Sequence, residues 1–273
     1  MADVADDELY RQYETVNVYR RGAGAKLELN RPERMNAWND KFSDDLLAAI
    51  QAVADDPEIR AVAVTGAGRA FSSGLDLKEA AEQAGDNLID VYGLLTERYH
   101  PLITGLRLMP KPVVAAVNGP AAGIGLSLAL ACDLVVAAES AFFQLVFANI
   151  GLVPDGGSSL FVPARVGFTR AAELAMLGER LDAQSAREWG LINKVWPDGE
   201  FSGEVDALLD RLAAGATRAY AGIKRELNQW LYARMDTQLE FEARLQRELA
   251  SSADFAEGLA GFLDKRPPRF SGT

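Results

Sequence analysis

The stretch KPVVAAVNGPAAGIGLSLALACDLVVAAE, residues 111 to 139, decides the fold class. It begins with an apolar, β-branched run, turns through Asn118-Gly119-Pro120, and continues after Gly123 into a run rich in Leu and Ala. A second apolar run follows Asp133. A membrane-spanning helix needs about 20 uninterrupted apolar residues, whereas each of these pieces has the length of a strand or a short buried helix. The stretch therefore predicts a strand, a glycine turn, a buried helix and another strand, which is the pattern of an α/β fold and not of a membrane protein.

The order of strand, glycine turn and helix occurs a second time, upstream of this stretch. AVAVTG (61–66) predicts a buried strand, and Gly74 precedes a helix predicted from Leu75 to Ala84. The first turn of a helix leaves backbone N–H groups without intrahelical partners and carries the positive end of the helix dipole. Two such starts, reached through Gly74, Gly123 and Gly125, predict a site that can hold a developing oxyanion.

The remaining pattern is β-rich at first and helical later. Residues 15–20 and 25–29 alternate in polarity around glycines and predict a hairpin, and a helix is expected from about residue 39 to 55. A helix is also expected from Leu126 to Ala131 and, after about residue 168, the pattern is helical apart from one strand at 194–196. We expect three parts: a flexible N-terminus (1–12), a core (13–200) and a C-terminal helical region (201–273).

Composition excludes several classes of partner and cofactor. The formal charge of −11 repels phosphate backbones and anionic lipid, so we expect neither nucleic acid nor a membrane as a partner. Cys132 is the single cysteine and lies in an apolar run, which predicts a buried thiol, no internal disulfide and a cytoplasmic protein. One histidine and one cysteine leave only scattered carboxylates as ligands, so we expect no metal site and no permanently bound cofactor.

Two glycine pairs raise the question of dinucleotide binding. Gly66-Ala67-Gly68 and Gly123-Ile124-Gly125 both follow predicted strands. The third glycine of the dinucleotide fingerprint would fall on Phe71 or Leu128, and neither permits close packing over a pyrophosphate. The sequence therefore does not support this function.

The segment GLSLA (125–129) differs by one residue from the nucleophile elbow of serine hydrolases. The only histidine, His100, precedes Ser127, whereas the elbow fold places its histidine last. We therefore expect Ser127 to be a small residue packed on a buried helix. For His100 two interpretations stay open, a residue near a cleft and a structural histidine.

Five segments resemble, in their order and spacing, the signatures of the crotonase superfamily, the enoyl-CoA hydratase/isomerase family. They are RPERMNAW (31–38), GRAFSSGLDLKE (68–79), KPVVAAVNGPAAGIGLSLALACDLVVAAE (111–139), IGLVPDGGSS (150–159) and EGLAGFLDKRPPRF (257–270). The resemblance implies an α/β spiral of ββα units followed by a C-terminal helical trimerisation region. It further implies an acyl-CoA thioester substrate, with coenzyme A present only as part of that substrate, and a homotrimer or a dimer of trimers.

The same resemblance implies roles for individual residues. The two oxyanion donors would be the N–H groups of Leu75 and Ile124, and Lys78 would meet phosphate. Phe262 and Lys265 match positions that often reach the CoA of a neighbouring subunit; a core aromatic and a solvated lysine are the alternatives. The expected catalytic residues are Asp155, Leu75 and Ile124, and the expected substrate-binding residues are Met35, Ala37, Ser73, Gly74, Asp76, Leu77, Lys78, Gly123, Gly125, Phe147, Phe262 and Lys265.

Departures from the family's hydratases bear on the reaction. A hydratase of this family uses two glutamates, and the matching positions hold Ser127 and Phe147, which cannot act as carboxylate bases. Asp155, within Pro154-Asp155-Gly156-Gly157, resembles the aspartate of the Δ3,Δ2-enoyl-CoA and epoxyphenylacetyl-CoA isomerases of the family, which is thought to shuttle a proton. The apolar side chains around it would raise its pKa by desolvation. The alternative for Asp155 is a helix N-cap.

The sequence therefore predicts an acyl-CoA isomerase that moves a double bond through a thioester enolate. Leu75 and Ile124 would hold the enolate, and Asp155 would move the proton. Two alternatives stay open: a hydratase whose base is relocated to Asp76 or Glu79, and a non-catalytic acyl-CoA-binding protein that kept the fold.

Overall fold

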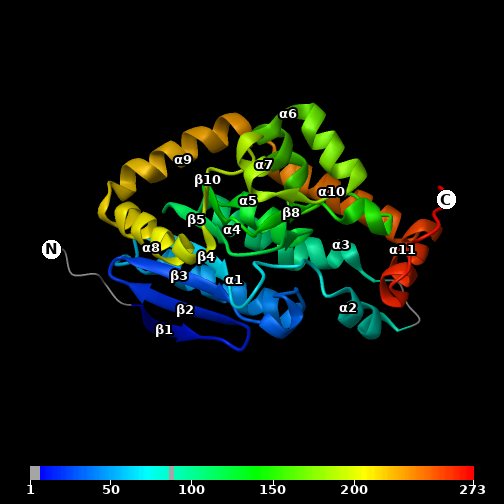
Figure 1. Ribbon diagram of the computed structural model, residues 1–273, viewed down its shortest axis with the longest axis horizontal. Helices are drawn as coiled ribbons and strands as arrows, with labels where there is room; N and C mark the ends of the chain where they lie inside the picture. Colours follow the sequence, from blue (N-terminus) through cyan, green and yellow to red (C-terminus); the bar gives the residue numbers. More distant parts are fainter. Residues whose placement is uncertain (1–6, 86–88) are drawn as a thin grey trace.

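The structure is a computed structural model that describes residues 7–85 and 89–273, and in these ranges a seven-stranded sheet forms its centre (Figure 1). The strand order is β1-β2-β3-β4-β5-β7-β10, with β1, β2 and β3 antiparallel and the others parallel. The strands are β1 (Glu8–Gln12), β2 (Val16–Arg21), β3 (Gly24–Leu29), β4 (Ala61–Gly66), β5 (Val113–Val117), β7 (Leu134–Ala138) and β10 (Lys194–Trp196). A smaller sheet consists of β6 (Ala121–Ala122), β8 (Phe142–Gln144) and β9 (Leu181–Asp182).

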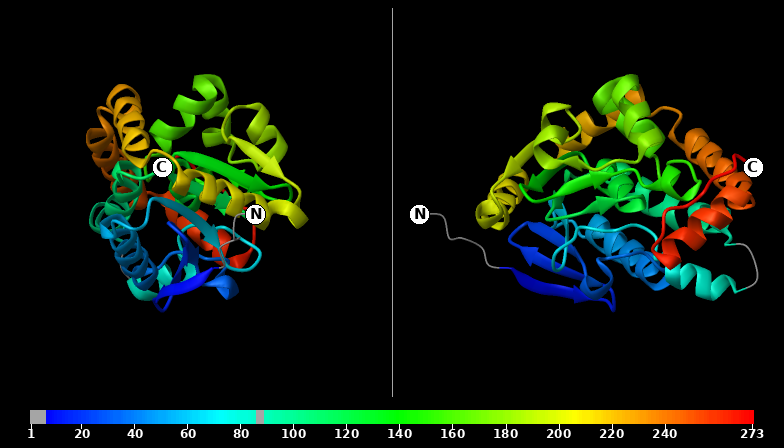
Figure 2. Two further views of the ribbon diagram at one scale, coloured as in Figure 1. Left: turned by 90° about the vertical axis from the view of Figure 1, so that its left-hand side faces the viewer. Right: turned by 45° about the vertical axis from the view of Figure 1, so that its right-hand side comes forward.

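Helices cover both faces of the large sheet and one end of the molecule (Figures 1 and 2). They are α1 (Asp40–Asp55), α2 (Leu77–Ala84), α3 (Val91–Gly93), α4 (His100–Leu108), α5 (Ile124–Ala131), α6 (Ser158–Leu177), α7 (Ala183–Glu188), α8 (Asp198–Ala214), α9 (Thr217–Leu231), α10 (Met235–Ala250) and α11 (Ala253–Asp264). Three further segments are helical without being α-helices. They are the 3₁₀-helices η1 (Pro32–Arg34) and η3 (Phe147–Ile150) and the π-helix η2 (Leu94–Tyr99).

Most of the predicted elements are confirmed. The hairpin is formed by β2 and β3, whose turn places Gly22 at a φ of 54°. Helix α1 begins where the Asn39 side chain accepts a hydrogen bond from the N–H of Phe42 at 2.9 Å, which is an N-cap. The stretch 112–138 forms β5, β6, α5 and β7, and Cys132 is buried in it. None of the described helices combines the length and the apolar character that crossing a membrane requires.

Four predictions about elements were wrong. Helix α2 begins at Leu77 and not at Leu75, because the Asp76 side chain caps it by accepting from the N–H of Glu79. Helix α5 begins at Ile124, two residues before the predicted start. Residues 8–12 form β1 against β2 and are not a flexible end; residues 1–6 lie outside the described part of the chain. The two-residue strand β9 was missed, and the predicted boundary near residue 200 stays a prediction, although α8 crosses it.

The two faces of the sheet pack against different helices, because successive residues of a strand point to opposite sides. In β4, Ala61 and Ala63 pack against α8, whereas Val62 and Val64 join the larger apolar cluster with α1 and α4. A Cβ atom at Gly24 would lie 2.8 Å from Cγ of Leu209 on α8, so α8 approaches the sheet closely. The rigid sheet thus fixes the loops that leave the carboxyl ends of β4 and β5.

A buried cluster of charged side chains connects α4, α9 and the start of β7. Asp133, directly before β7, pairs with Arg107 of α4 and with Lys224 of α9, whose Nζ lies 2.8 Å from Oδ2. The same carboxylate accepts a hydrogen bond from the N–H of Val113 at 2.9 Å. Lys224 also donates to the carbonyl oxygen of Leu106. The side chains of Arg107 and Lys224 are each only 6% exposed, so both depend on this carboxylate for neutralisation.

Asp133→Asn should therefore lower the free energy of unfolding by about 3–5 kcal/mol, since it leaves two buried cations without a counter-charge. The matched control is Glu82→Gln, which breaks the exposed pair with Lys78 and should cost less than about 1 kcal/mol. Urea denaturation of the three proteins measures both values. Equal stability of the Asp133 and Glu82 variants would contradict the assigned role of the cluster.

Candidate active site

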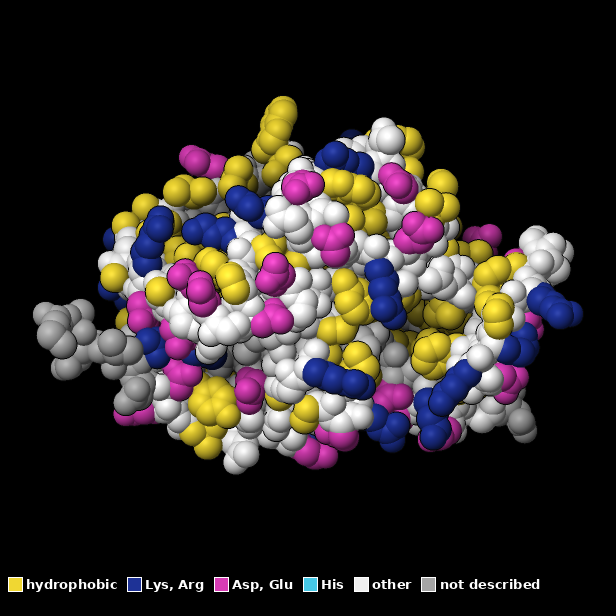
Figure 3. Space-filling model, viewed as in Figure 1, with side chains coloured by type: hydrophobic (Ala, Val, Ile, Leu, Met, Phe, Trp, Pro, Cys, Tyr) yellow, Lys and Arg dark blue, Asp and Glu magenta, His cyan; other side chains and the backbone are white. Residues whose placement is uncertain are grey.

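A cavity of about 720 Å³ opens at the end of the molecule where α2, α3, η3 and α11 meet. Figure 3 shows a hollow at this end with hydrophobic side chains on its floor and Lys and Arg side chains near its rim. The residues that line it are Arg34, Met35, Ala37, Ser73, Gly74, Leu75, Asp76, Leu77, Lys78, Val91, Leu94, Tyr99, Gly123, Ile124, Val146, Phe147, Asn149, Ile150, Leu152, Asp155, Phe255, Gly258, Phe262, Leu263, Lys265, Arg266 and Pro268. All predicted site residues except Gly125 are among them.

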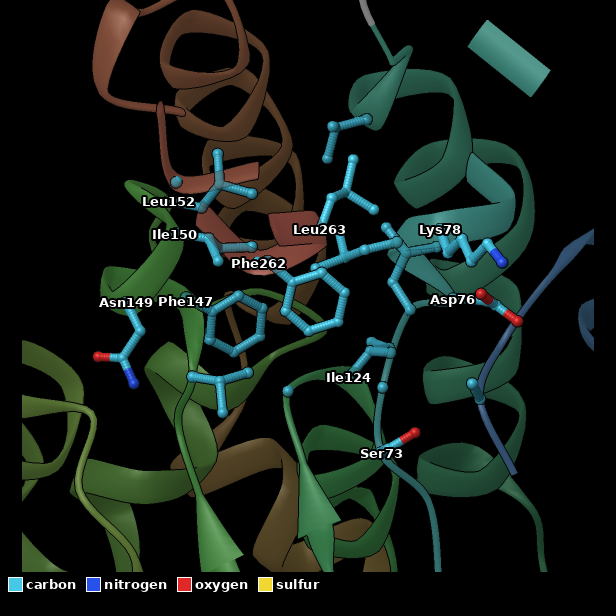
Figure 4. A pocket seen from close by; sticks show the side chains of 18 of the residues that line it. Ser73, Asp76, Lys78, Ile124, Phe147, Asn149, Ile150, Leu152, Phe262 and Leu263 are labelled. Atoms are coloured by element: carbon cyan, nitrogen blue, oxygen red, sulfur yellow. The ribbon is translucent and has the colours of Figure 1, made fainter. Parts of the chain in front are cut away.

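Aromatic and aliphatic side chains form the middle of the cavity (Figure 4). The rings of Phe147 and Phe262 point toward each other across it, and Ile124 lies beneath them. Asn149 is turned away from these rings, and its side chain donates to the carbonyl oxygen of Gly178 at 3.1 Å. The interior is therefore apolar, and the few polar groups that reach it are held in low dielectric.

Two backbone segments approach each other at the floor of the cavity. Gly74 has a φ of 90° and Gly123 a φ of 54°, and a Cβ atom at Gly74 would lie 3.6 Å from Cα of Gly123. The N–H groups of Leu75 and Ile124 follow these glycines, and neither donates a backbone hydrogen bond within the part of the chain that the structure describes. Two unpaired N–H groups on adjacent segments in an apolar cavity are suited to bind one oxyanion.

The two donors are held in different ways, which corrects the prediction of two helix starts. Ile124 is the first residue of α5, so its N–H is one of the unpaired groups of a helix N-terminus. Leu75 precedes α2, and backbone hydrogen bonds from Trp38 to both of its neighbours hold it in place. The N–H of Trp38 donates to the carbonyl oxygen of Gly74 at 2.8 Å, and the carbonyl oxygen of Trp38 accepts from the N–H of Asp76 at 2.9 Å. Only one donor therefore benefits from a helix dipole.

Gly125 does not line the cavity, which corrects its assignment as a binding residue. A Cβ atom at this position would lie 2.6 Å from Cβ of Ser72 and 2.8 Å from its carbonyl oxygen. Gly125 thus lets α5 pack against the segment that carries Ser73 and Gly74. Its contribution to the oxyanion site is indirect.

The loop of Met35 and Ala37 forms one wall of the cavity. Met35 and Asn36 both have a φ of 54°, a conformation that side chains rarely adopt. The buried Asn36 amide donates to the carbonyl oxygens of Ala67 and Ala70, and these bonds hold the strained turn in place. The Ser73 N–H donates to the Met35 carbonyl oxygen at 3.0 Å, so this wall is tied to the first oxyanion segment.

Four cationic side chains line the same cavity, namely Arg34, Lys78, Lys265 and Arg266. Lys78 and Lys265 were predicted, whereas Arg34 and Arg266 were not. Lys78 is 61% exposed at its side chain and approaches Glu82 only to 3.8 Å, so its charge faces solvent near the opening. These cations offset the acidic character of the chain at the point where a ligand would enter.

Helix α11 closes one side of the cavity. Phe262 and Lys265 line the cavity of their own chain, and their predicted contact with the CoA of a neighbouring subunit stays a prediction, because the structure describes a single chain. Phe262 is 53% exposed, so it is not the core aromatic of the alternative prediction. Its ring lies beside that of Phe147 in the middle of the cavity (Figure 4).

Asp155 is the carboxylate at the inner end of the cavity and is only 5% exposed. The Gln246 amide donates to its Oδ2 at 2.7 Å, and Oδ1 has no hydrogen-bond partner among the described residues. Burial, followed by the nearby charge of Glu242, raises the pKa of this carboxyl well above its ordinary value. Asp155 therefore combines a free oxygen with a raised proton affinity.

The N-cap interpretation of Asp155 was wrong. The N-cap residue of α6 is Gly157, and the first N–H groups, those of Gly157 and Ser159, donate to the carboxylate of Glu242 at 2.8 and 3.1 Å. The Asp155 side chain makes no cap bond. Its carbonyl oxygen instead accepts from Ser158 Oγ at 2.8 Å.

Ser127 and Phe147 are the residues that the resemblance matches to the two glutamates of the family's hydratases. Ser127 is fully buried, as predicted for a packed residue of α5, and its hydroxyl donates to the Asp155 carbonyl oxygen at 2.7 Å. It thereby supports the loop of the aspartate. Phe147 lines the cavity and keeps that side of it apolar.

Three residues that surround Asp155 were also not predicted: Tyr99, Glu242 and Gln246. Tyr99 lines the cavity with its hydroxyl buried and unpaired within the described ranges, and its ring packs edge-on against Trp38 at 5.0 Å. Glu242 and Gln246 lie one turn apart on α10. Nothing in their local sequence distinguishes them from the surface residues of a charged helix, so no sequence signal was available.

The other candidate groups are placed as follows. Asp76 lines the cavity but caps α2 and lies 3.5 Å from Arg31. Glu79 lies outside the cavity, and its two oxygens accept from Asn39 and Arg31. His100 begins α4 and does not line the cavity, which favours the structural interpretation. Burial lowers its pKa.

Gly74→Ala should disturb the oxyanion segments, because the new Cβ would lie 3.0 Å from the Ala122 carbonyl oxygen next to Gly123. We expect about tenfold weaker binding of a CoA thioester, the ligand implied by the resemblance, since a hydrogen bond to its carbonyl oxygen is worth about 0.5–1.5 kcal/mol. Gly167→Ala is the matched control, because Gly167 has a similar φ of 76° but nothing within 4 Å of its Cβ position. Calorimetric titration measures both affinities; equal losses would show that backbone strain alone is responsible.

Comparison with known proteins confirms the resemblance and the fold class. The family model for enoyl-CoA hydratase/isomerase matches residues 20–273. A probable enoyl-CoA hydratase of Rhodobacter capsulatus is 44% identical over 248 residues, covering 91% of this chain and 94% of that protein. A 1,2-epoxyphenylacetyl-CoA isomerase of Escherichia coli is 42% identical over 247 residues, covering 90% and 94%. An enoyl-CoA hydratase crystal structure from Mycobacterium avium subsp. paratuberculosis matches with a TM-score of 0.86 at 38% identity, covering 95% of this chain and 100% of that one.

With this fold and this site, the chain belongs to the enoyl-CoA hydratase/isomerase family of the crotonase superfamily, and it is an acyl-CoA-processing enzyme.

Proposed function

We propose that this enzyme is an acyl-CoA isomerase that converts a 3-enoyl thioester into a 2-enoyl thioester, or catalyses a related proton-transfer rearrangement. One observation carries the proposal: the cavity with the two unpaired N–H groups contains a buried carboxylate, Asp155, with one oxygen free. A single group of this kind suffices for a reaction that removes a proton and returns it at another carbon.

The proposed reaction balances within the site. Asp155 removes a proton from Cα of the 3-enoyl thioester, and the electron pair of that C–H bond moves into the thioester enolate. The N–H groups of Leu75 and Ile124 donate to the enolate oxygen, each contributing about 3 kcal/mol at the transition state. The protonated Asp155 then returns the proton to Cγ, and the double bond is left between Cα and Cβ.

Hydration is the second candidate function. It needs a group that activates water, and Ser127 is engaged with the Asp155 carbonyl oxygen, while Phe147 offers no base. Asp76 is the better candidate for the base of a hydratase, because it lines the cavity and its Oδ2 has no hydrogen-bond partner in the described residues. Glu79 is disfavoured, since both its oxygens are occupied. The relatives named above include both a hydratase and an isomerase.

Incubation of the purified enzyme with 3-enoyl-CoA and, separately, with 2-enoyl-CoA distinguishes the candidates. An isomerase shifts the double bond of the first substrate, and Asp155→Asn should lower its kcat by roughly 100-fold or more, as loss of a general base does. Asp76→Asn is the matched control and should retain most of this activity. Water addition that depends on Asp76 would support the hydratase, and binding of both thioesters without turnover would support a non-catalytic protein.

The pH dependence of isomerisation should reflect the raised pKa of Asp155. The base acts as a carboxylate, so kcat falls as the pH decreases through this raised pKa. We therefore expect the acid limb of the kcat profile well above the pH range in which an exposed aspartate titrates. An acid limb at the ordinary aspartate pKa would contradict Asp155 as the base.

We further propose that the enzyme is a homotrimer or a dimer of trimers. Helix α9 presents an apolar stripe to the outside, formed by Ile223, Leu227, Trp230 and Leu231, at helical spacing. Trp230 is 86% exposed, which is unusual for a large aromatic side chain without a partner. A cytoplasmic location and the absence of a permanently bound cofactor stay predictions.

Trp230→Glu should convert the trimeric assembly to monomers, because it introduces a charge into the apolar stripe. Leu9→Glu on β1 is the matched control, since Leu9 is exposed at 56% but lies on a different element. Size-exclusion chromatography with light scattering gives the mass of each variant. A Trp230 variant that keeps the wild-type mass would exclude this stripe as the interface.

A further inference from the structure

Helix α10 directs three polar side chains at the segment that carries Asp155. Gln238, Glu242 and Gln246 are spaced four residues apart and so share one face of the helix. Gln238 donates to Ser159 Oγ at 2.9 Å, and the other two act on the turn and on Asp155 itself. None of the three lines the cavity, so they do not touch the substrate.

Glu242 lies behind Asp155 and is only 2% exposed. Its carboxylate accepts from the N–H groups of Gly157 and Ser159, which begin α6. Burial raises the pKa of Glu242 to about 7, although the hydrogen bonds from Ser159 and Gly157 favour the charged form. Neither Glu242 nor Asp155 forms a salt bridge with a cation of the described residues.

Gln246 is completely buried, and its amide nitrogen donates twice. It bonds to the carbonyl oxygen of Val153 at 2.6 Å and to Oδ2 of Asp155 at 2.7 Å. The first bond fixes the amide relative to the backbone, and the second then fixes the rotation of the Asp155 carboxyl. The two oxygens of Asp155 are thus different: Oδ2 is held, and Oδ1 is free.

We propose that Glu242 and Gln246 are positioning residues of this enzyme: Gln246 holds Oδ2 of Asp155 and leaves Oδ1 as the oxygen that exchanges the proton, and Glu242 places a second buried carboxylate on the turn that follows Asp155. The inference rests on the proposed function of Asp155 as the proton carrier. It adds that this carrier is controlled from α10, where Gln246 lies 91 residues further along the chain.

The two residues act on Asp155 in opposite directions. The negative charge of Glu242 raises the pKa of Asp155, and the hydrogen bond from Gln246 lowers it. Among the described residues, Tyr99 of η2 is a further titratable group that faces this carboxyl; its own pKa is raised mainly by burial and further by the charge of Asp155, so that it stays neutral. Removing the Glu242 charge and the Gln246 donor in separate variants should therefore shift the pKa of Asp155 in opposite directions.

The test is the titration of Asp155 in the full-length enzyme without substrate. Protein labelled with ¹³C at the aspartate carboxyl carbon is titrated by NMR, and the Asp155 signal is assigned by its loss in Asp155→Asn. Glu242→Gln should move the midpoint to lower pH, because the neighbouring charge is gone. Gln246→Met, of similar length but without a donor, should move it to higher pH. Gln238→Met is the matched control on the same helix face and should leave it unchanged.

Kinetics then separate this inference from the proposed function. If the enzyme isomerises 3-enoyl-CoA, the acid limb of kcat should follow the same two opposite shifts, and Gln246→Met should lower kcat with little change in KM. If the wild-type enzyme isomerises no substrate, the proposed function fails, whereas the NMR titration still tests the effect of α10 on Asp155.

Midpoints that do not move, or that move in the same direction in both variants, would overturn the inference and reduce Glu242 and Gln246 to packing residues. Thermal unfolding of each variant establishes that it is folded before it is titrated. If Glu242→Gln fails to fold, Gln246→Met and Gln238→Met still decide whether the donor on Asp155 is specific.

Discussion

The close approach of Gly74 to Gly123 is the constraint on which the rest of the site depends. Two segments that follow different parallel strands come within van der Waals distance, and each presents an unpaired N–H group to the same cavity. A side chain at either glycine would separate them or strain a backbone with positive φ. Gly125 supports the same contact indirectly, because the absence of a side chain there permits α5 to pack on Ser72. Rigid β4 and β5, buried on both faces, keep the two segments in register.

This arrangement requires a dry environment, and the chain provides it with side chains from distant elements. Phe147 from η3 and Phe262 from α11 cover the cavity from two sides, so the N–H donors and Asp155 act in low dielectric. The same burial raises the pKa of Asp155 well above its ordinary value, which supports its proposed role as the base. Lys and Arg side chains lie near the rim of the cavity (Figure 3).

The segment around Asp155 is held by polar contacts that replace those of a simple helix cap. Ser127 and Ser158 bind its carbonyl oxygen, Glu242 caps α6, and Gln246 holds one carboxyl oxygen. Each contact satisfies a buried polar group, and together they leave one oxygen of Asp155 unsatisfied. An unpaired buried oxygen is costly, so its presence in a cavity indicates a site that is completed by a ligand.

The amino-acid sequence by itself determined the order of most elements and the two glycine turns. These properties are local, because strand and helix periodicity, turn residues and burial preference depend on neighbouring positions. The candidate residues Leu75, Ile124 and Asp155 came instead from the resemblance of the sequence motifs to those of the family. Only the tertiary structure decided that Trp38 and not a helix start holds Leu75, that Gly125 serves packing, and that α11 covers the cavity of its own chain. The hydrogen bond from Gln246 to Asp155 was likewise visible only in the tertiary structure. Hydrogen bonds between residues far apart in the chain depend on how helices pack, and that packing has no signature in the local sequence.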